Sequence, residues 1–137
     1  MTAYLLDTNH ASPLVTLQHP LRQKVLAAFD TGDTFAINVV ILAETLYGIS
    51  SVPRSAQNRA LWSQIQPQLR CYAPDESDAI WAVDLQVSLR KQGRQLATID
   101  ALIAVTALRY DLTLLTTDGD FRAVPNLRLA NWRELHP

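Results

Sequence analysis

Short apolar runs of strand length alternate along the chain with longer stretches in which apolar residues recur at helical spacing. The strand-like runs are residues 4–6, 34–38, 69–72, 112–117 and 127–130. The helix-like stretches are residues 9–17, 20–30, 39–49, 55–66, 75–92 and 98–108. Strands that alternate with helices are typical of an α/β fold. The pattern therefore predicts a single domain, residues 1–137, with a mostly parallel central sheet flanked by helices.

Two of the predicted strands end in acidic residues. The first, Tyr4-Leu5-Leu6, is followed by Asp7-Thr8-Asn9, and the run at 112–117 is followed by Asp118-Gly119-Asp120. In open parallel sheets, ligands bind in the crevice beyond the carboxyl ends of the strands. If the two strands are neighbours, Asp7, Asp118 and Asp120 lie together at that edge of the sheet.

Two predicted helices each carry a single acid among apolar residues. Residues 39–49 form a nearly continuous apolar run whose only charge is Glu44, and its length favours a buried helix. An acid in such surroundings is costly unless it is paired or bound to a metal. The stretch at 98–108 carries Asp100 near its start. Both acids are candidates for the same site as the strand-end aspartates.

Each of these acids also has a simpler structural explanation. Asp7 could cap the following helix, and Asp100 could stabilise a helix start. Glu44 could pair with a buried arginine, and the acids around Gly119 could be turn residues. One explanation that covers them all is divalent-metal catalysis. Mg²⁺ and Mn²⁺ take oxygen ligands and can activate water for phosphodiester hydrolysis.

Composition narrows the class of protein without identifying a substrate. Charged residues make up 18% of the chain, below the roughly 25% of an average soluble domain. The net charge of −1 indicates no broad basic surface, although an RNA enzyme can use a local basic rim. Arg90, Lys91 and Arg94 lie near the end of a predicted helix. There they either contact RNA phosphates or simply complement the helix dipole.

Cysteine, histidine and hydropathy exclude several other classes. Cys71 is the only cysteine, so a disulfide within the chain and a cysteine zinc site are excluded, and we expect it to be buried in a strand. His10, His19 and His136 have no metal-ligand spacing. The sequence shows no signal-peptide pattern and no apolar run of ~18 residues. We therefore expect a cytoplasmic protein with no membrane segment.

The acids occur in an order that resembles a known family. Leu6-Asp7-Thr8-Asn9 ends the first strand, Glu44 lies in an apolar helix, and Ile99-Asp100-Ala101 opens another. Thr116-Thr117-Asp118-Gly119-Asp120-Phe121 follows a late strand, and Asn131-Trp132 lies near the end of the sequence. This ordered set resembles a PIN domain, and more closely the VapC ribonuclease toxins of bacterial toxin–antitoxin pairs. The resemblance covers essentially the whole chain.

The resemblance implies a metal-dependent endoribonuclease. The catalytic and metal-binding residues would be Asp7, Glu44, Asp100 and Asp118, which would hold Mg²⁺, with Mn²⁺ as a substitute. The supporting residues would be Thr8, Asn9, Thr117 and Asp120, the last at a more variable position of the family. Arg90, Lys91 and Arg94 are the candidates for RNA binding.

The resemblance also implies partners, namely an RNA substrate, a cognate antitoxin protein and a second copy of the chain in a homodimer. Trp81, Leu85 and the apolar residues around Tyr47 are candidates for these interfaces as well as for the core.

Three other interpretations depend on the same residues. A receiver-like signalling domain needs a lysine at the end of a late strand, and the only lysines are Lys24 and Lys91. A Rossmann dinucleotide enzyme needs a glycine-rich loop after the first strand, and none follows it. A catalytically inactive PIN fold that binds RNA or protein stays open, although all four acids are present.

Overall fold

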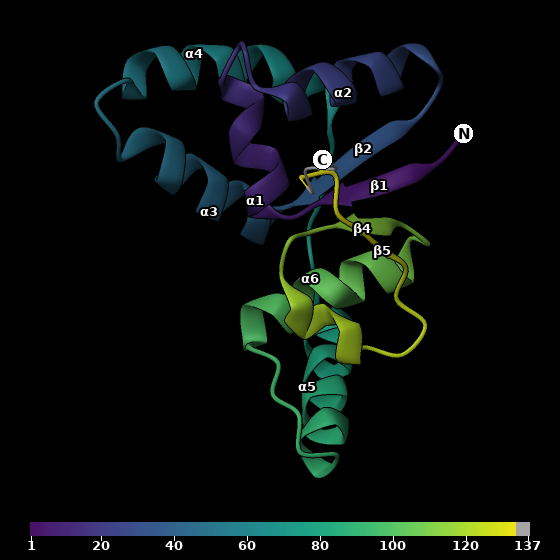
Figure 1. The fold of residues 1–137 in the computed structure, drawn as a ribbon. Coiled ribbons are helices and arrows are strands. Elements are labelled where there is room, and N and C mark those ends of the chain that lie inside the picture. Colours follow the sequence, from purple (N-terminus) through teal and green to yellow (C-terminus); the bar gives the residue numbers. More distant parts are fainter. Residues whose placement is uncertain (134–137) are drawn as a thin grey trace.

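The computed structural model describes residues 1–133, which form a five-stranded sheet with helices on both sides (Figure 1). The strand order is β3-β2-β1-β4-β5, and every pairing is parallel. The strands are β1 (Ala3–Leu6), β2 (Thr34–Asn38), β3 (Arg70–Tyr72), β4 (Thr113–Leu115) and β5 (Leu129–Ala130). The predicted α/β fold with a parallel central sheet is confirmed.

The helices form two groups, with α1 to α4 on one side of the sheet and α5 and α6 on the other (Figure 1). The first group is α1 (Thr8–Ala11), α2 (Pro20–Asp30), α3 (Val39–Ser50) and α4 (Ser55–Ile65). The second is α5 (Glu76–Lys91) and α6 (Thr98–Arg109). Short 3₁₀ turns are η1 (Ser12–Val15), η2 (Gln66–Gln68) and η3 (Gly119–Ala123). The predicted helices are therefore present with small differences at their ends, except that the one predicted at residues 9–17 is divided into α1 and the 3₁₀ turn η1.

β1 is the middle strand, and its position decides where the first acid lies. Leu5 and Leu6 of β1 are fully buried, as are the β4 residues Leu114 and Leu115 that pair with them. The parallel pairing continues one step further, since the backbone N–H of Asp7 donates to Leu115 O at 3.0 Å. Burial of these apolar side chains thus fixes Asp7 at the carboxyl edge of the sheet, next to the end of β4.

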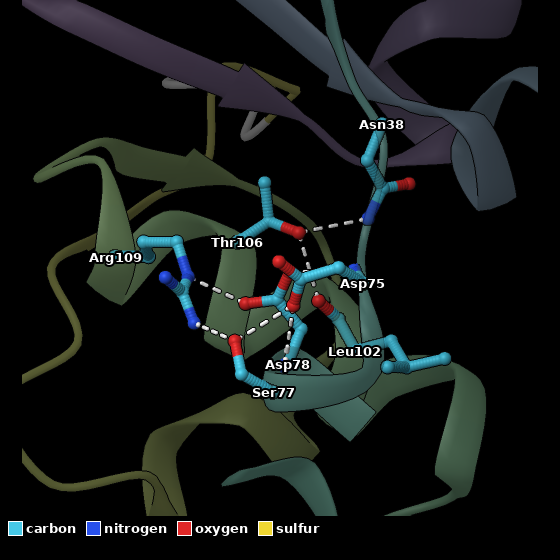
Figure 2. A network of polar contacts seen from close by, with 7 residues as sticks. All are labelled: Asn38, Asp75, Ser77, Asp78, Leu102, Thr106 and Arg109. Carbon is cyan, nitrogen blue, oxygen red and sulfur yellow. Dashed lines mark hydrogen bonds and ion pairs between the residues drawn. The ribbon is translucent and has the colours of Figure 1, made fainter. Parts of the chain in front are cut away.

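An ion pair between a buried carboxylate and a partly exposed guanidinium joins α5 to α6 (Figure 2). Asp75 caps α5 in a reciprocal capping box with Asp78, as the sequence predicts for Asp75. The buried carboxylate of Asp78 pairs with the guanidinium of Arg109, the last residue of α6. Arg109 also donates to Ser77 Oγ at 2.8 Å. The start of α5 is therefore tied to the end of α6.

A second set of polar contacts links α6 to the end of β2 (Figure 2). The side-chain amide of Asn38 donates to Thr106 Oγ1 at 3.0 Å, and Thr106 in turn donates to Leu102 O at 2.9 Å. The other end of the Asn38 side chain accepts from Ile41 N and so caps α3. These buried bonds hold α3 and α6 relative to the sheet.

Two expectations about burial are wrong. Cys71 is exposed, because β3 is an edge strand and its residues have a partner strand on one side only. Helix α3 is buried on one face only: Ile41 and Ile49 are buried, whereas Val39 and Tyr47 are exposed. An unbroken apolar run does not reveal which of its faces packs on the core.

Helix α5 also carries apolar residues on its outside. Of the two apolar stripes in its sequence, one ends in the buried Leu89 and includes the half-buried Leu85. The other, formed by Ile80, Val83 and Val87, is exposed. No helix within residues 1–133 is both long and apolar enough to cross a membrane.

Candidate active site

Asp7 is a buried carboxylate held by three donors. It caps α1, its Oδ1 accepting from Thr8 N at 2.8 Å. Its Oδ2 accepts from Thr116 Oγ1 at 2.7 Å and from Asn9 Nδ2 at 3.3 Å. Burial raises the pKa of Asp7, while the bonds from Thr116 and Thr8 oppose that rise. Asp7 does cap α1. The burial of its carboxylate and the two hydrogen bonds to Oδ2 are not needed for that role.

Thr116 is a central residue of the site that the sequence analysis did not single out. Its buried hydroxyl donates to Asp7 Oδ2 and accepts from Asp118 N at 3.0 Å. The predicted neighbour, Thr117, instead donates through its backbone N–H to Asn9 Oδ1 at 3.2 Å. The role of Thr116 could have been predicted only from the register of β1 and β4. Leu6 pairs with Leu115, so the next residues, Asp7 and Thr116, lie side by side. Sequence alone does not contain that register.

His10 is a second residue that was missed as a member of the network. Its ring is fully buried, with Nδ1 2.6 Å from Asn9 Oδ1 and Nε2 accepting from Trp132 N at 3.0 Å. Since Nε2 accepts, Nδ1 carries the proton and donates to Asn9. Burial, with Arg133 and Lys24 adding, lowers the pKa of His10 to about 4. A neutral histidine thus orients Asn9; His136, in contrast, lies outside the described residues.

Glu44 reaches the site from the exposed side of α3. Its Oε1 accepts from Thr8 Oγ1 at 3.0 Å. The side chain is exposed, and no ion pair involves it within residues 1–133. Pairing with a buried arginine is therefore not the reason for an acid in this apolar helix.

Asp100 gives the clearest sign that the acids share one site. It is the third residue of α6, whose N-cap is Ala97, and no side chain caps that helix. Burial, as the largest cause, and the charges of Asp118, Asp7, Glu44 and Asp120, in that order, together raise the pKa of Asp100 from 3.8 to about 6. Four carboxylates from three separate parts of the chain, the end of β1, α3 and the turn at η3, thus act on a fifth.

Asp118 and Asp120 lie at the turn after β4. Asp118 caps η3 by accepting from Asp120 N at 2.9 Å through Oδ1. The interpretation of Asp118 as a turn residue is therefore correct, since its side chain binds the backbone of the turn. The charge of Asp118 nevertheless acts on both Asp7 and Asp100, so it belongs to the acidic cluster as well.

The donor set suits a hard divalent cation. Within residues 1–133, no group of three His, Cys, Asp or Glu side chains stands ready to hold a metal ion in its present arrangement. The acids that converge offer only carboxylate oxygens, which are the ligands that Mg²⁺ and Mn²⁺ prefer. A cation among them would relieve the repulsion that raises the pKa of Asp100. The residues present therefore fit such a group.

Comparison with known proteins gives the family. A model of the PIN domain matches residues 4–127 of this chain. The chain belongs to the PIN-domain family. It is 28% identical over 130 residues to the protein named Ribonuclease VapC2 of Rickettsia felis, across 94% of this chain and 97% of that relative. The family predicted from the order of the acids is confirmed.

Solved structures share the fold of this PIN domain. The crystal structure of VapBC2 from Rickettsia felis bound to a promoter DNA fragment matches with a TM-score of 0.81 and 26% identity, over 96% of this chain and 99% of that one. DNA-bound VapBC from Salmonella typhimurium matches with a TM-score of 0.79 and 22% identity, over 96% of this chain and 99% of that one. At the latter identity the likeness concerns the fold alone.

The predicted basic residues of this PIN domain do not all lie in one place. Arg90 and Arg94 line a pocket of about 470 Å³ between α5, the segment that follows it, and η3. Asp120 lines the same pocket, which therefore borders the acidic site. Lys91 is not part of this lining. The two arginines are thus the better placed of the three for contact with a phosphate.

Proposed function

We propose that this PIN domain is a Mg²⁺-dependent endoribonuclease that acts as the toxin of a toxin–antitoxin pair. The observation that carries the proposal is the charge environment of Asp100, whose pKa is raised to about 6 by burial and by the charges of four other carboxylates. The similarity over nearly the full length to the relative named Ribonuclease VapC2 supports RNA as the substrate.

In this proposal Asp7 and Asp100 hold the catalytic metal, and Glu44 and Asp118 complete the set. When bound, Mg²⁺ or Mn²⁺ supplies Lewis acidity and lowers the pKa of water for attack on a phosphodiester. The remaining residues act on the carboxylates. Thr116 and Asn9 fix the orientation of Asp7, and the backbone N–H of Asp120 fixes that of Asp118.

Thr8 contacts Glu44, the most exposed of the four proposed metal-binding acids. Its hydroxyl donates to Glu44 Oε1, and its own backbone N–H donates to Asp7 Oδ1. One residue thus connects the carboxylates of β1 and α3. Asn9 has a similar role between Asp7 and the backbone at Thr117.

The proposed partners are RNA, a cognate antitoxin and a second copy of this chain, and the proposed place of action is the cytoplasm, where RNA is available. Support for the antitoxin comes from relatives whose structures are VapBC assemblies. Support for the dimer comes from exposed apolar residues on α3 and α5. The antitoxin is tested by co-purification with the product of the neighbouring reading frame.

The test of the activity is cleavage of single-stranded RNA by the purified chain. We expect cleavage with Mg²⁺ or Mn²⁺, none in EDTA, and no requirement for Zn²⁺, because the acids offer no cysteine or histidine ligands. Asp84→Asn is a matched control, because Asp84 is an exposed acid of α5 outside the cluster. Full activity in EDTA, or equal loss in Asp84→Asn and Asp100→Asn, would refute the proposal.

A further inference from the structure

A pocket beside the acids has no role in the site described so far. It is bounded by the last turns of α5, by residues 94–97 and by η3, and has a volume of about 470 Å³. A smaller hollow of about 250 Å³ shares Arg94, Gln95 and Asp120 with it and extends toward Gly119. The backbone N–H of Asp120 donates to Asp118. The pocket thus opens directly next to the acidic cluster, and its size is within the range of ligand sites.

One wall of the pocket is apolar and uncovered. Val83 and Val87 are 50% and 48% exposed, one turn apart on α5. Leu96 and Ala97 form the facing part of the lining. About half of the surface of Val83 and Val87 is therefore left in contact with water, whereas Leu96 is only 6% exposed.

The rim of the pocket carries two arginines, and Asp120 lies where the pocket borders the acids. Arg90 and Arg94 both line it and are exposed. Neither forms an ion pair within residues 1–133, where the paired arginines are Arg109 and Arg128. A planar guanidinium suits bidentate contact with phosphate and can also stack on a flat ring.

The pocket is held open by hydrogen bonds. Gly93 has a φ of 75°, a left-handed conformation that ends α5 and turns the chain. Arg94 N then donates to Leu89 O at 2.9 Å. Gln86 Nε2 donates to Leu96 O at 2.9 Å and to Thr98 Oγ1 at 3.2 Å, which ties the loop to the helix. The walls are therefore in place before any ligand arrives.

We propose that this pocket binds the base of a nucleotide that flanks the scissile phosphate of single-stranded RNA, with Arg90 and Arg94 on the adjoining phosphate. The inference rests on the proposed function and names a base subsite within it. A nucleotide combines a flat apolar face with an anion, which matches one apolar wall beside two unpaired arginines. An RNA strand whose phosphodiester lies at the acids reaches the pocket next, because Asp120 borders both.

The test uses a labelled single-stranded RNA that the chain cleaves at one position. A series of this RNA carries one abasic nucleotide at each place in turn, and binding is measured in EDTA at low salt. We expect the affinity to fall about tenfold for one abasic position next to the cleavage site, and less than twofold for the others.

Val87→Trp fills the pocket and provides the second half of the test. It should weaken binding of the intact RNA about tenfold, and the critical abasic position should then cause no further loss. Ile80→Trp is the matched control, because Ile80 lies on the same exposed face of α5 but outside the lining of this pocket. Its abasic profile should equal that of the wild type.

Arg94→Ala separates the phosphate contact from the base contact. It should weaken all RNAs of the series alike and reduce the salt dependence by about one phosphate contact. Losses in Arg94→Ala that depend on the base, with an unchanged salt slope, would contradict the assigned role.

Several results would overturn the subsite. These are equal losses at every abasic position, or additive effects of Val87→Trp and the abasic site. A Val87→Trp variant that binds RNA normally but no longer co-purifies with the antitoxin would show a peptide pocket instead. Failure of the wild type to cleave RNA in Mg²⁺ refutes the proposed function, whereas cleavage without a base-dependent position refutes the subsite alone.

Discussion

Asp100 differs from Asp7 and Asp118 in having no capping role. Asp7 and Asp118 each accept a backbone N–H at the start of a helical segment, so their charges are partly compensated. The side chain of Asp100 has no hydrogen bond within the described residues, and burial and four neighbouring acids raise its pKa to about 6. The charged form of Asp100 is therefore disfavoured in the folded, metal-free protein.

Asp100→Asn is therefore expected to abolish cleavage while stabilising the metal-free protein. The folded pKa of Asp100 lies above its ordinary value of 3.8, so the metal-free protein loses stability as the pH rises from about 3.8 through about 6. In EDTA at pH 8 the variant should melt roughly 2–4 °C higher than the wild type, and the difference should vanish near pH 4. The measurements are thermal melting in EDTA and the cleavage rate in Mg²⁺. A variant that is less stable yet cleaves normally would show that Asp100 serves the helix start.

At the residue scale, the acids and the adjacent supports Thr8 and Asn9 were predictable, whereas the supports Thr116 and His10 were not. An aspartate after an apolar strand has to lie at the sheet edge, so Asp7 and Asp118 could be placed from the sequence. Thr116 and His10 depend on the register of β1 with β4 and on the return of the chain at Trp132. Both depend on contacts between residues far apart in the sequence, and no local sequence pattern marks either residue.

At the scale of elements, helix ends were predicted well because capping is local chemistry. Asp75 and Gly93 delimit α5 where the sequence places them. The burial of faces was predicted less well. Helix α3 has apolar residues all round, so its pattern does not show that Val39 and Tyr47 face outward. The edge position of β3, which exposes Cys71, follows from the strand order and not from the strand itself.

The ion pair between α5 and α6 should contribute more to stability than the other ion pair of the described chain. Asp78 is 6% exposed, whereas Asp111, which pairs with Arg128, is 86% exposed. Asp78→Asn should cost about 2 kcal/mol, because it leaves Arg109 opposite a neutral amide in a partly buried place. Asp111→Asn should cost less than about 1 kcal/mol. Asparagine suits this control because residue 111 has a φ of 56°.

Urea unfolding of the two variants measures this difference. Equal losses would show that burial adds nothing to the pair between Asp78 and Arg109. Because Arg109 is the last residue of the helix whose first turn carries Asp100, Asp78→Asn also tests whether anchoring of α6 at its far end affects cleavage.

At the scale of the whole molecule, the parallel sheet brings together residues from four distant parts of the chain. β1, α3, α6 and the end of β4 each contribute one acid of the proposed set. This convergence follows from the topology, since the carboxyl ends of neighbouring parallel strands share one edge. The same arrangement leaves apolar side chains of α3 and α5 on the outside, where an isolated monomer would expose them to water.

The exposed apolar residues lead to a prediction about assembly. Tyr47 is 77% exposed on α3, and aromatic residues at such places commonly carry much of an interface's binding energy. We expect the chain to be a homodimer at micromolar concentration, and Tyr47→Glu to raise the dimer dissociation constant at least about tenfold. Leu17→Glu is the matched control, because Leu17 is 54% exposed at a position outside both helices and should leave the dimer intact. Light scattering after size exclusion measures the mass of each variant. A monomeric wild type would refute the dimer, and equal dissociation of both variants would refute the placement of its interface on α3.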